Sequence, residues 1–442
     1  MSIKFEKITV QNNFITIFIF CFFLLSIFLG PSIVNLSHTI FVLFFLYKLT
    51  QSNFKINFSP NLIIILQIIF CVYLALNTFF INSEFSFNGE KSLFYFRFFL
   101  FAFIISQILS LNTKSIKLIS IIFCTVSILL SLDIFLQYIT GFDIFSFKAG
   151  LCVYPDGEQN YDPKNCERFS GFFGKEFIAG SYLSTYGLYF TFLTFQLISS
   201  SKFKKSILSI IFATLILAII ITGERNAILS LVLIFLFNVF FNKEIRKYLL
   251  YASLLGTVIL IFSFFNFKHV KYRYIDWPLN YILSKEGNIL QKLSSTPWGA
   301  HYVISGEIFS NNLLFGKGYK SFRYECKKEK YNFENLNQKY NLSLLFSGCS
   351  THPHNLYFEI LAENGIFGFI LFMLILYFLI FEKFRKRKLN TLNDKLLIFT
   401  LSIIFSFLFP LRPTGSISAT IYGTHLWFFI GFYLFFVKNP KY

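Results

Sequence analysis

Two histidines, His352 and His354, are the residues best suited to acid–base chemistry in this sequence. They flank Pro353 in the stretch CSTHPHNLYFEI, just ahead of a long apolar run. Imidazole exchanges a proton near neutral pH, so either ring can act as a general base. A His-x-His pair can also bind a metal ion, but the sequence offers no clear third ligand nearby. We therefore interpret the pair as proton-transfer residues, with a surface histidine as the alternative.

Solitary charges within apolar stretches form the second group of candidates. Arg97 lies in SLFYFRFFLFAF, Arg225 in TGERNAIL and Arg412 in FPLRPTGS, while Asp133 lies in another apolar run. A charge inside a membrane is costly, so each is a functional candidate. For Arg97 and Asp133, a snorkelling side chain or a buried ion pair is an equal alternative. Arg225 follows a glycine-containing turn, where a guanidinium and a helix N-terminus would both favour a phosphate.

The composition identifies the surroundings of these residues. The 442 residues are 55% hydrophobic and only 14% charged, with 40 Lys and Arg against 22 Asp and Glu. Soluble proteins carry about 25% charged residues, and disordered basic tails are poor in aromatic residues. Because the basic residues cluster between long apolar runs, the charge of +18 points to a membrane protein rather than to a nucleic-acid-binding protein.

We predict an all-α integral membrane protein with about twelve transmembrane helices, since each crossing needs about 20 apolar residues. Half of the basic residues fall in alternate short loops, which places both termini in the cytoplasm. The first run lacks a following cleavage site and reads as a retained helix. The apolar runs are 14–30, 33–47, 61–81, 92–111, 116–139, 177–199, 206–222, 225–241, 247–267, 366–381, 395–411 and 424–437.

Two longer segments fall on the outer face of this single membrane domain, which spans residues 1–442. The first covers 140–176, and the second, 268–365, lies between the ninth and tenth helices, is long enough for several helices and carries His354. Each contains two cysteines, which suggests a disulfide in each segment and an oxidising compartment. Four free thiols are the alternative, and a zinc site is less favoured. These cysteines are Cys152, Cys166, Cys326 and Cys349.

One motif carries a resemblance to a known family. His354 and Asn355 are followed by nine residues, Gly365, two residues and Gly368, which resembles the signature of the bacterial O-antigen ligase/polymerase family. The stretch EIFSNNLLFGKGYKSF (307–322) resembles the family's segment ending in a Gly-x-Gly turn. TGERNAIL (222–229) resembles the family's stretch with an outer-face arginine, and RFSGFFGKEFIAGSYL (168–183) and FPLRPTGS are also similar.

The resemblance implies a membrane glycosyltransferase whose donor is a polysaccharide on undecaprenyl pyrophosphate. Ligases of the family transfer it to lipid A–core at the periplasmic face of the inner membrane, inverting the anomeric centre without a metal or cofactor. By resemblance, His354 is the base, Arg225 binds the pyrophosphate, and Asn355 orients His354 or the acceptor. A further family arginine is missing from SSTPWGAHYVISGEIF. His301 and Arg323 are candidates to replace it, and His352, Arg97 and Arg412 are further candidates for substrate binding.

Three other functions compete with the ligase. A polymerase of the same family would join lipid-linked repeat units instead. A transporter of lipid-linked glycans would show repeated halves and broken helices at mid-membrane, neither of which is visible in the sequence. A non-catalytic scaffold would not need a polar cluster at its outer face. The expected partners are therefore a lipid-linked donor, a glycan acceptor and the bilayer, and not a nucleic acid.

Overall fold

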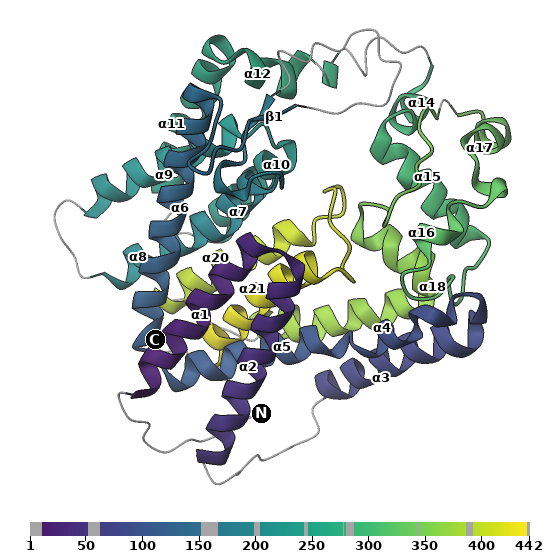
Figure 1. Cartoon of the computed structure of the whole chain (residues 1–442), viewed down its shortest axis with the longest axis horizontal. Coiled ribbons are helices and arrows are strands. Elements are labelled where there is room, and N and C mark those ends of the chain that lie inside the picture. The colour runs from purple at the N-terminus through teal and green to yellow at the C-terminus, as the bar shows by residue number, and fades with distance from the viewer. Residues whose placement is uncertain are drawn as a thin grey trace.

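The computed structural model describes nine stretches of the chain, and these are almost entirely helical (Figure 1). Within them, β1 (Gly150–Leu151) and β2 (Glu167–Arg168) form one short antiparallel pair. The described stretches are 11–51, 62–151, 167–198, 204–242, 246–276, 278–279, 287–342, 344–385 and 392–439.

Each of the twelve apolar runs coincides with a helix or a series of helices. Among the described residues, six helices are long and apolar enough to cross a membrane, and four apolar helices are shorter. The protein is therefore a multi-pass membrane protein. The main helices of this bundle are α1 (Gln11–Leu29), α2 (Pro31–Gln51), α3 (Leu62–Leu76), α5 (Phe96–Leu111), α6 (Ser115–Thr140), α8 (Leu188–Leu197), α9 (Lys204–Ile221), α10 (Arg225–Phe241), α11 (Arg246–Asn266), α18 (Leu356–Leu376), α20 (Leu392–Phe407) and α21 (Thr420–Lys438).

Short helices connect the members of the bundle. Several of them are single turns of 3-10 or π-helix that continue a longer helix, as at the end of α3 and of α18. They are η1 (Asn77–Ile81), η2 (Ser83–Asn88), α4 (Gly89–Leu93), η4 (Gly171–Phe173), α7 (Ala179–Tyr182), η5 (Leu183–Gly187), α12 (Lys268–Lys271), η6 (Tyr272–Asp276), η8 (Tyr377–Phe381) and α19 (Glu382–Arg385).

The interior of the bundle is rich in aromatic side chains. Trp427 of α21 is fully buried, and its ring meets that of Phe99 of α5 edge-on at 4.7 Å between centroids. Phe23 of α1 stacks on Phe428 at 4.7 Å. Such pairs add to the free energy gained by burying apolar area, so the abundant phenylalanine fills the space between the helices around α21.

A second, smaller core lies in the segment between α12 and α18. The helices of this segment are α14 (Ile289–Ser294), α15 (Pro297–Ser310), α16 (Phe322–Glu325), η7 (Glu329–Tyr331) and α17 (Phe333–Tyr340). All of them except α14 contribute residues to this core, and α18 adds Ala362. Ile304, Phe322 and Leu336 are buried at its centre. We call residues 287–355 the outer segment.

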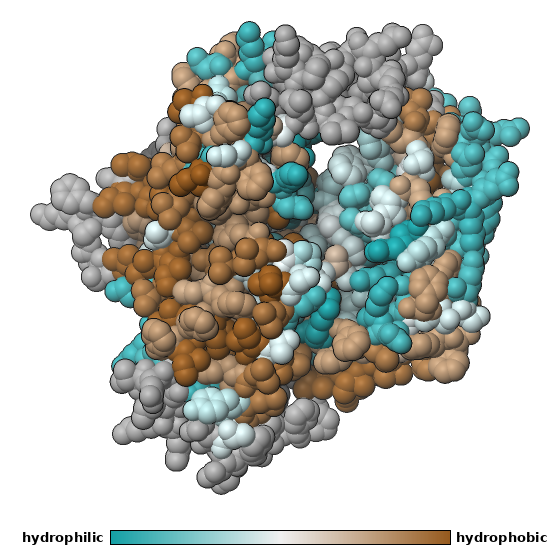
Figure 2. All heavy atoms as spheres, in the orientation of Figure 1, coloured by the Kyte–Doolittle hydropathy of each residue, from teal (hydrophilic) through white to brown (hydrophobic). Residues whose placement is uncertain are grey.

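The bundle and the outer segment differ in surface character. In Figure 2, hydrophobic side chains cover the bundle, whereas hydrophilic ones cover the face of α15 to α17. A hollow with hydrophilic residues at its edge separates the two parts in this view. The loop between α20 and α21, residues 408–419, extends toward this region in Figure 1. Polar groups thus collect where the outer segment faces the bundle.

Two glycines allow the outer segment to approach α18 closely. Gly365 interrupts α18 with φ 63°, and a Cβ at this position would lie 2.3 Å from the carbonyl oxygen of Leu314. Gly316 has φ 66°, and its Cβ would lie 2.5 Å from the backbone of Glu363. Only glycine fits such a close approach with a left-handed backbone. This close contact explains why positions 365 in the signature and 316 in the Gly-x-Gly turn are both glycine.

Candidate functional site

Three imidazoles gather immediately before α18. The ring centroid of His354 lies 4.1 Å from that of His352 and 4.9 Å from that of His301, which comes from α15. The ring centroid of Trp298 also lies 4.9 Å from that of His354. The structure thus brings together the three histidines that the sequence singled out, although His301 is about fifty residues away along the chain.

Hydrogen bonds distinguish His354 from its two neighbours. His301 Nδ1 donates to the carbonyl of Gly348 at 2.7 Å, and His352 Nε2 donates to that of Thr414 at 3.3 Å. Thr351 donates its hydroxyl to His352 Nδ1. Within the described part of the chain, neither ring nitrogen of His354 has a hydrogen-bond partner. The ring of His354 is therefore positioned by packing and keeps a nitrogen for a ligand.

The imidazole of His354 is uncharged in this structure. Burial, assisted by the neighbouring His352 and His301, lowers the pKa of His354 to about 3. Burial also lowers the pKa of His352 to about 4. An apolar surrounding disfavours the charged imidazolium, so His354 is neutral at physiological pH and carries a nitrogen lone pair that can accept a hydrogen bond from a hydroxyl group.

The backbone around His354 is unusual. Its φ of 55° places a non-glycine residue in the left-handed region, and its carbonyl accepts from the amide of Thr414 at 2.8 Å. Such conformations persist where the surroundings enforce them, often at functional sites. The next residue, Asn355, caps α18 by accepting from the amides of Tyr357 and Phe358, and its Nδ2 donates to Pro410. Asn355 thus fixes the start of α18 and, through it, the position of His354.

Two buried carboxylates on one face of α18 hold the neighbouring loops. Glu359 accepts from the Ser416 hydroxyl and the Ile417 amide. Glu363, one turn later, accepts from the amides of Lys320 and Phe322 at 2.8 and 3.3 Å. We did not identify these two from the sequence. Their spacing of four residues, which places two acids on one face of an apolar helix, was the available signal.

Arg225 begins α10 beside several other charged groups. The carboxylate of Glu224 accepts from the amides of Gly180 and Ser181 at 2.7 and 3.1 Å. Burial raises the pKa of Glu224, and the charge of Arg168 opposes this rise. The charges of Arg168, Arg225, Arg273 and Glu224 all act on one side chain, Tyr274, so these groups lie near one another.

Arg412 lies next to this group and is 2% exposed. Its Nε donates to Asn226 Oδ1 and its Nη1 to the carbonyl of Ser406, both at 2.9 Å. Arg273 Nε donates to the carbonyl of Gly223 at 3.0 Å. We call Arg168, Arg225, Arg273 and Arg412, together with Glu224, the paired cluster.

The other predicted arginines, Arg97 and Arg323, lie on α5 and α16. Arg97, in the first turn of α5, donates to Thr420 Oγ1 at 3.2 Å, and Arg323 lies in α16. Asp133 accepts instead from the amide of Ile144, so Arg97 and Asp133 contact different segments. The charge of Arg323 contributes to the lowered pKa of His352, which places Arg323 beside the imidazoles.

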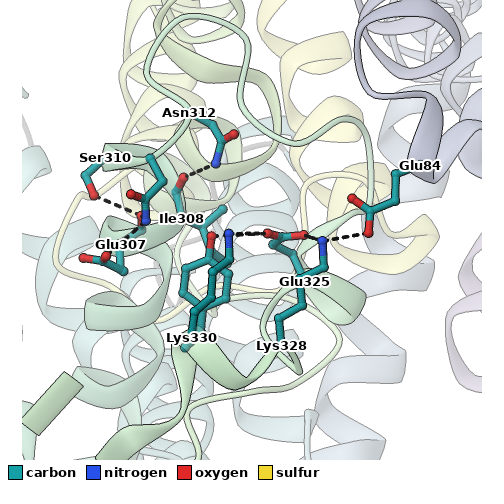
Figure 3. Close-up of polar contacts among 10 residues, drawn as sticks. Glu84, Glu307, Ile308, Ser310, Asn312, Glu325, Lys328 and Lys330 are labelled. Atoms are coloured by element: carbon teal, nitrogen blue, oxygen red, sulfur yellow. Dashed lines mark hydrogen bonds and ion pairs between the residues drawn. The ribbon is translucent and has the colours of Figure 1, made fainter. Parts of the chain in front are cut away.

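The nearest acid along the chain to Arg323 is engaged elsewhere. Figure 3 shows Glu325 between Lys328 and Lys330, with Lys328 also reaching Glu84 of η2. The Lys328 ammonium lies 2.6 Å from Glu325 and 2.7 Å from Glu84. These pairs fasten the outer segment to the end of the bundle and leave Arg323 without this carboxylate.

The cysteines of the outer segment are joined. Cys326 and Cys349 form a disulfide with 5.4 Å between their Cα atoms, and Cys326 lies in the smaller core. The bond ties α16 to the stretch that precedes His352. Cys152 and Cys166, the pair predicted in the first outer segment, lie outside the described residues. Among the described residues, no group of three or more His, Cys, Asp or Glu side chains is arranged to hold a metal ion.

The fold and the site define a multi-helix membrane protein with a neutral imidazole, His354, in a group of three histidines. Residues 210–373 match the family model described as O-antigen ligase. Over this stretch, from α9 into α18, the chain is similar to the O-antigen ligase family, in agreement with the resemblance of the His-Asn signature. The match contains Arg225, His301, Arg323, His352 and His354. No curated protein matches the chain.

Proposed function

We propose that this protein is an O-antigen ligase-like glycosyltransferase. It transfers a polysaccharide from undecaprenyl pyrophosphate to lipid A–core at the periplasmic face of the bacterial inner membrane, with about twelve spans and both termini in the cytoplasm. The outer segment and His354 then face the periplasm. The observation that carries this proposal is the neutral imidazole of His354, which makes no hydrogen bond within the described residues and lies in the stretch that matches the family model.

The chemistry requires two separate tasks. The acceptor hydroxyl needs a base, and His354 takes its proton as the oxygen attacks the anomeric carbon. The bond from that carbon to the pyrophosphate oxygen breaks, and negative charge develops on the leaving group. Guanidinium groups stabilise such charge with bidentate hydrogen bonds, and Arg225 takes this role. Attack opposite the leaving group inverts the anomeric centre, and no metal is required.

The other residues of the site support these two. His352 and His301, each anchored to a backbone carbonyl, hold the ring of His354. Asn355 fixes the start of α18, and Arg412 connects the loop after α20 to Asn226 beside Arg225. The same geometry suits an O-antigen polymerase, which would use a second lipid-linked unit as the acceptor. A transporter is the least supported alternative, because the free imidazole has no role in moving a lipid.

The glycolipid profile of a deletion strain tests the proposal. A ligase predicts long lipid-linked chains that are not attached to lipid A–core, whereas a polymerase predicts accumulation of single repeat units. Complementation with His354→Ala or Arg225→Ala should fail, although both variants insert in the membrane. A normal profile in the deletion strain would contradict both functions. Transfer in vitro should also be insensitive to EDTA, and a strong loss would instead indicate a metal bound by His352 and His354.

A further inference from the structure

Three cationic side chains from two distant parts of the chain lie near one another, and one of them, Arg323, is close enough to His352 to act on its pKa. Arg97 comes from the start of α5, while Lys320 and Arg323 follow the Gly316-x-Gly318 turn of the outer segment. Burial lowers the pKa of Lys320, and the positive charges of Arg323 and Arg97 lower it further. Glu363 and Glu359 act in the opposite direction. We call Arg97, Lys320 and Arg323 the unpaired cluster.

Among the described residues, none of the three has a carboxylate partner within ion-pair distance. The ion pairs between described residues involve Lys328, Lys330 and Lys339, and no member of the unpaired cluster. The nearby acids Glu359 and Glu363 offset the repulsion only in part and form no ion pair with the cluster among the described residues. Their oxygens accept hydrogen bonds from Ser416, Ile417, Lys320 and Phe322. Like charges therefore face each other in a partly desolvated place, which disfavours the ligand-free state.

Two of the donors are also buried without an acceptor. The Nε atoms of Arg97 and Arg323 make no hydrogen bond among the described residues. The cluster's only side-chain hydrogen bond there runs from Arg97 to Thr420. A buried donor without a partner is costly, and few such groups occur in native proteins. An anionic ligand with several oxygens would satisfy these donors and neutralise the charge.

The backbone presents Lys320 in a constrained conformation. Lys320 has φ 57°, although a side chain rarely adopts this region, and its amide donates to Glu363. Positive-φ residues other than glycine concentrate at functional sites. The fold thus holds Lys320 in place through a buried carboxylate that bonds its backbone and leaves its ammonium available.

We propose that Arg97, Lys320 and Arg323 form a phosphate-binding site distinct from the paired cluster at Arg225. Its ligand is a phosphate or pyrophosphate ester, because tetrahedral oxyanions match guanidinium and ammonium donors. The identity of the molecule that carries the phosphate rests on the proposed function. It is either the lipid-linked donor or a phosphorylated acceptor, and both bring this group to a site beside His354.

Binding of inorganic pyrophosphate to the full-length protein tests the site itself. The variant is the double substitution Lys320→Asn with Arg323→Gln, because asparagine tolerates a positive φ. Calorimetric titration should show affinity reduced roughly tenfold or more relative to wild type. The control is Lys327→Gln, which removes one positive charge from an exposed position of the same segment.

The same titration on Arg225→Ala separates the two clusters. The pyrophosphate binding that survives in Arg225→Ala should disappear when Lys320→Asn and Arg323→Gln are added. If the double variant binds pyrophosphate as tightly as wild type, or if Lys327→Gln weakens binding equally, the unpaired cluster is not a phosphate site. This readout does not require turnover, so it can fail while the glycosyltransferase proposal holds, or succeed when that proposal fails.

Transfer kinetics then identify the source of the phosphate. With the double variant, a raised KM for the lipid-linked donor at unchanged acceptor KM assigns the site to the donor pyrophosphate. A raised KM for the acceptor alone assigns it to a phosphate of the acceptor. Unchanged KM values for both substrates would contradict a role for this site in either one.

Discussion

The two basic clusters differ in how their charges are satisfied. In the paired cluster, Arg412 and Arg273 donate to Asn226 and to backbone carbonyls, and Glu224 brings a buried carboxylate. In the unpaired cluster, buried Nε atoms lack acceptors and the neighbouring carboxylates hold backbone amides instead. The first arrangement supports the fold as well as a ligand, whereas the second is incomplete without one.

The difference follows from local chain geometry. Glu224 directly precedes Arg225, so a carboxylate enters the paired cluster together with its arginine. In α16, by contrast, Glu325 lies on another face from Arg323 and is held by Lys328 and Lys330. A carboxylate that is close to a cationic residue in sequence therefore neutralises that residue only when both side chains lie on the same side of the helix.

The largest effect on stability is expected in the paired cluster. Arg412→Gln removes the charged donor that bonds Asn226 Oδ1 and both the carbonyl and the hydroxyl of Ser406, and Ser406 is buried. The expected loss is roughly 4 kcal/mol of unfolding free energy. Denaturation of the purified variant in detergent measures it, with Lys327→Gln as the control. Wild-type stability would show that Arg412 is not held as described.

The disulfide supports only the cluster on the outer segment. Replacing Cys326 and Cys349 with serine should reduce the stability of this segment by about 3 kcal/mol, as for a closed loop of similar length. Limited proteolysis should then cut between residues 287 and 355 before it cuts the bundle. Equal protection of both parts would contradict a separate outer core.

Removing a charge from the unpaired cluster should stabilise the protein, in contrast to the two changes above. Lys320→Asn relieves repulsion from Arg323 and Arg97. The free energy of unfolding should therefore increase by less than about 1 kcal/mol, and the melting temperature should rise slightly. A drop in the melting temperature as large as that of Arg412→Gln would contradict the claim that only the paired cluster stabilises the fold.

The smallest effect concerns pH. His354 and His352 have pKa values lowered to about 3 and 4, below the ordinary 6.5. Below pH 6.5 the unfolded chain therefore binds more protons than the native state, and stability should fall as the pH falls. The decline in the free energy of unfolding between pH 7 and 6 should be slight, and it should be weaker still in His354→Asn.

The pH profile of kcat/KM provides a second measurement. Its acidic decline should lie well below pH 6.5, and a decline centred at pH 6.5 would contradict the burial of the His354 ring.

The sequence predicted the elements of this molecule better than their contacts. Apolar runs identify helices because membrane burial demands continuous hydrophobicity, and each of the twelve coincides with helical structure. The motif around His354 was recognisable because its chemistry and its glycines are close together in the chain. Whether all twelve runs cross the bilayer stays a prediction, since six helices reach the required length among the described residues.

Contacts between residues far apart in the sequence could not be predicted. Arg97 meets Thr420, more than three hundred residues away, and no local pattern encodes such a contact. Lys320 was missed, although Lys317, Lys320 and Arg323 recur at intervals of three just after the Gly-x-Gly turn. Glu359 and Glu363 were missed because their role depends on the loops that fold against α18. His301 was selected for its position near a missing arginine, and the structure places it in the histidine group instead.

The central claim is that His354 is the base of a glycosyl transfer. The direct measurement is the initial rate of transfer from a lipid-linked polysaccharide to lipid A–core by the purified protein and by His354→Asn. Asparagine accepts the left-handed backbone at this position but is not basic, so folding is preserved while proton transfer is lost. We predict a rate lower by roughly 10²–10⁴-fold at unchanged melting temperature. A wild-type rate in His354→Asn would contradict the account.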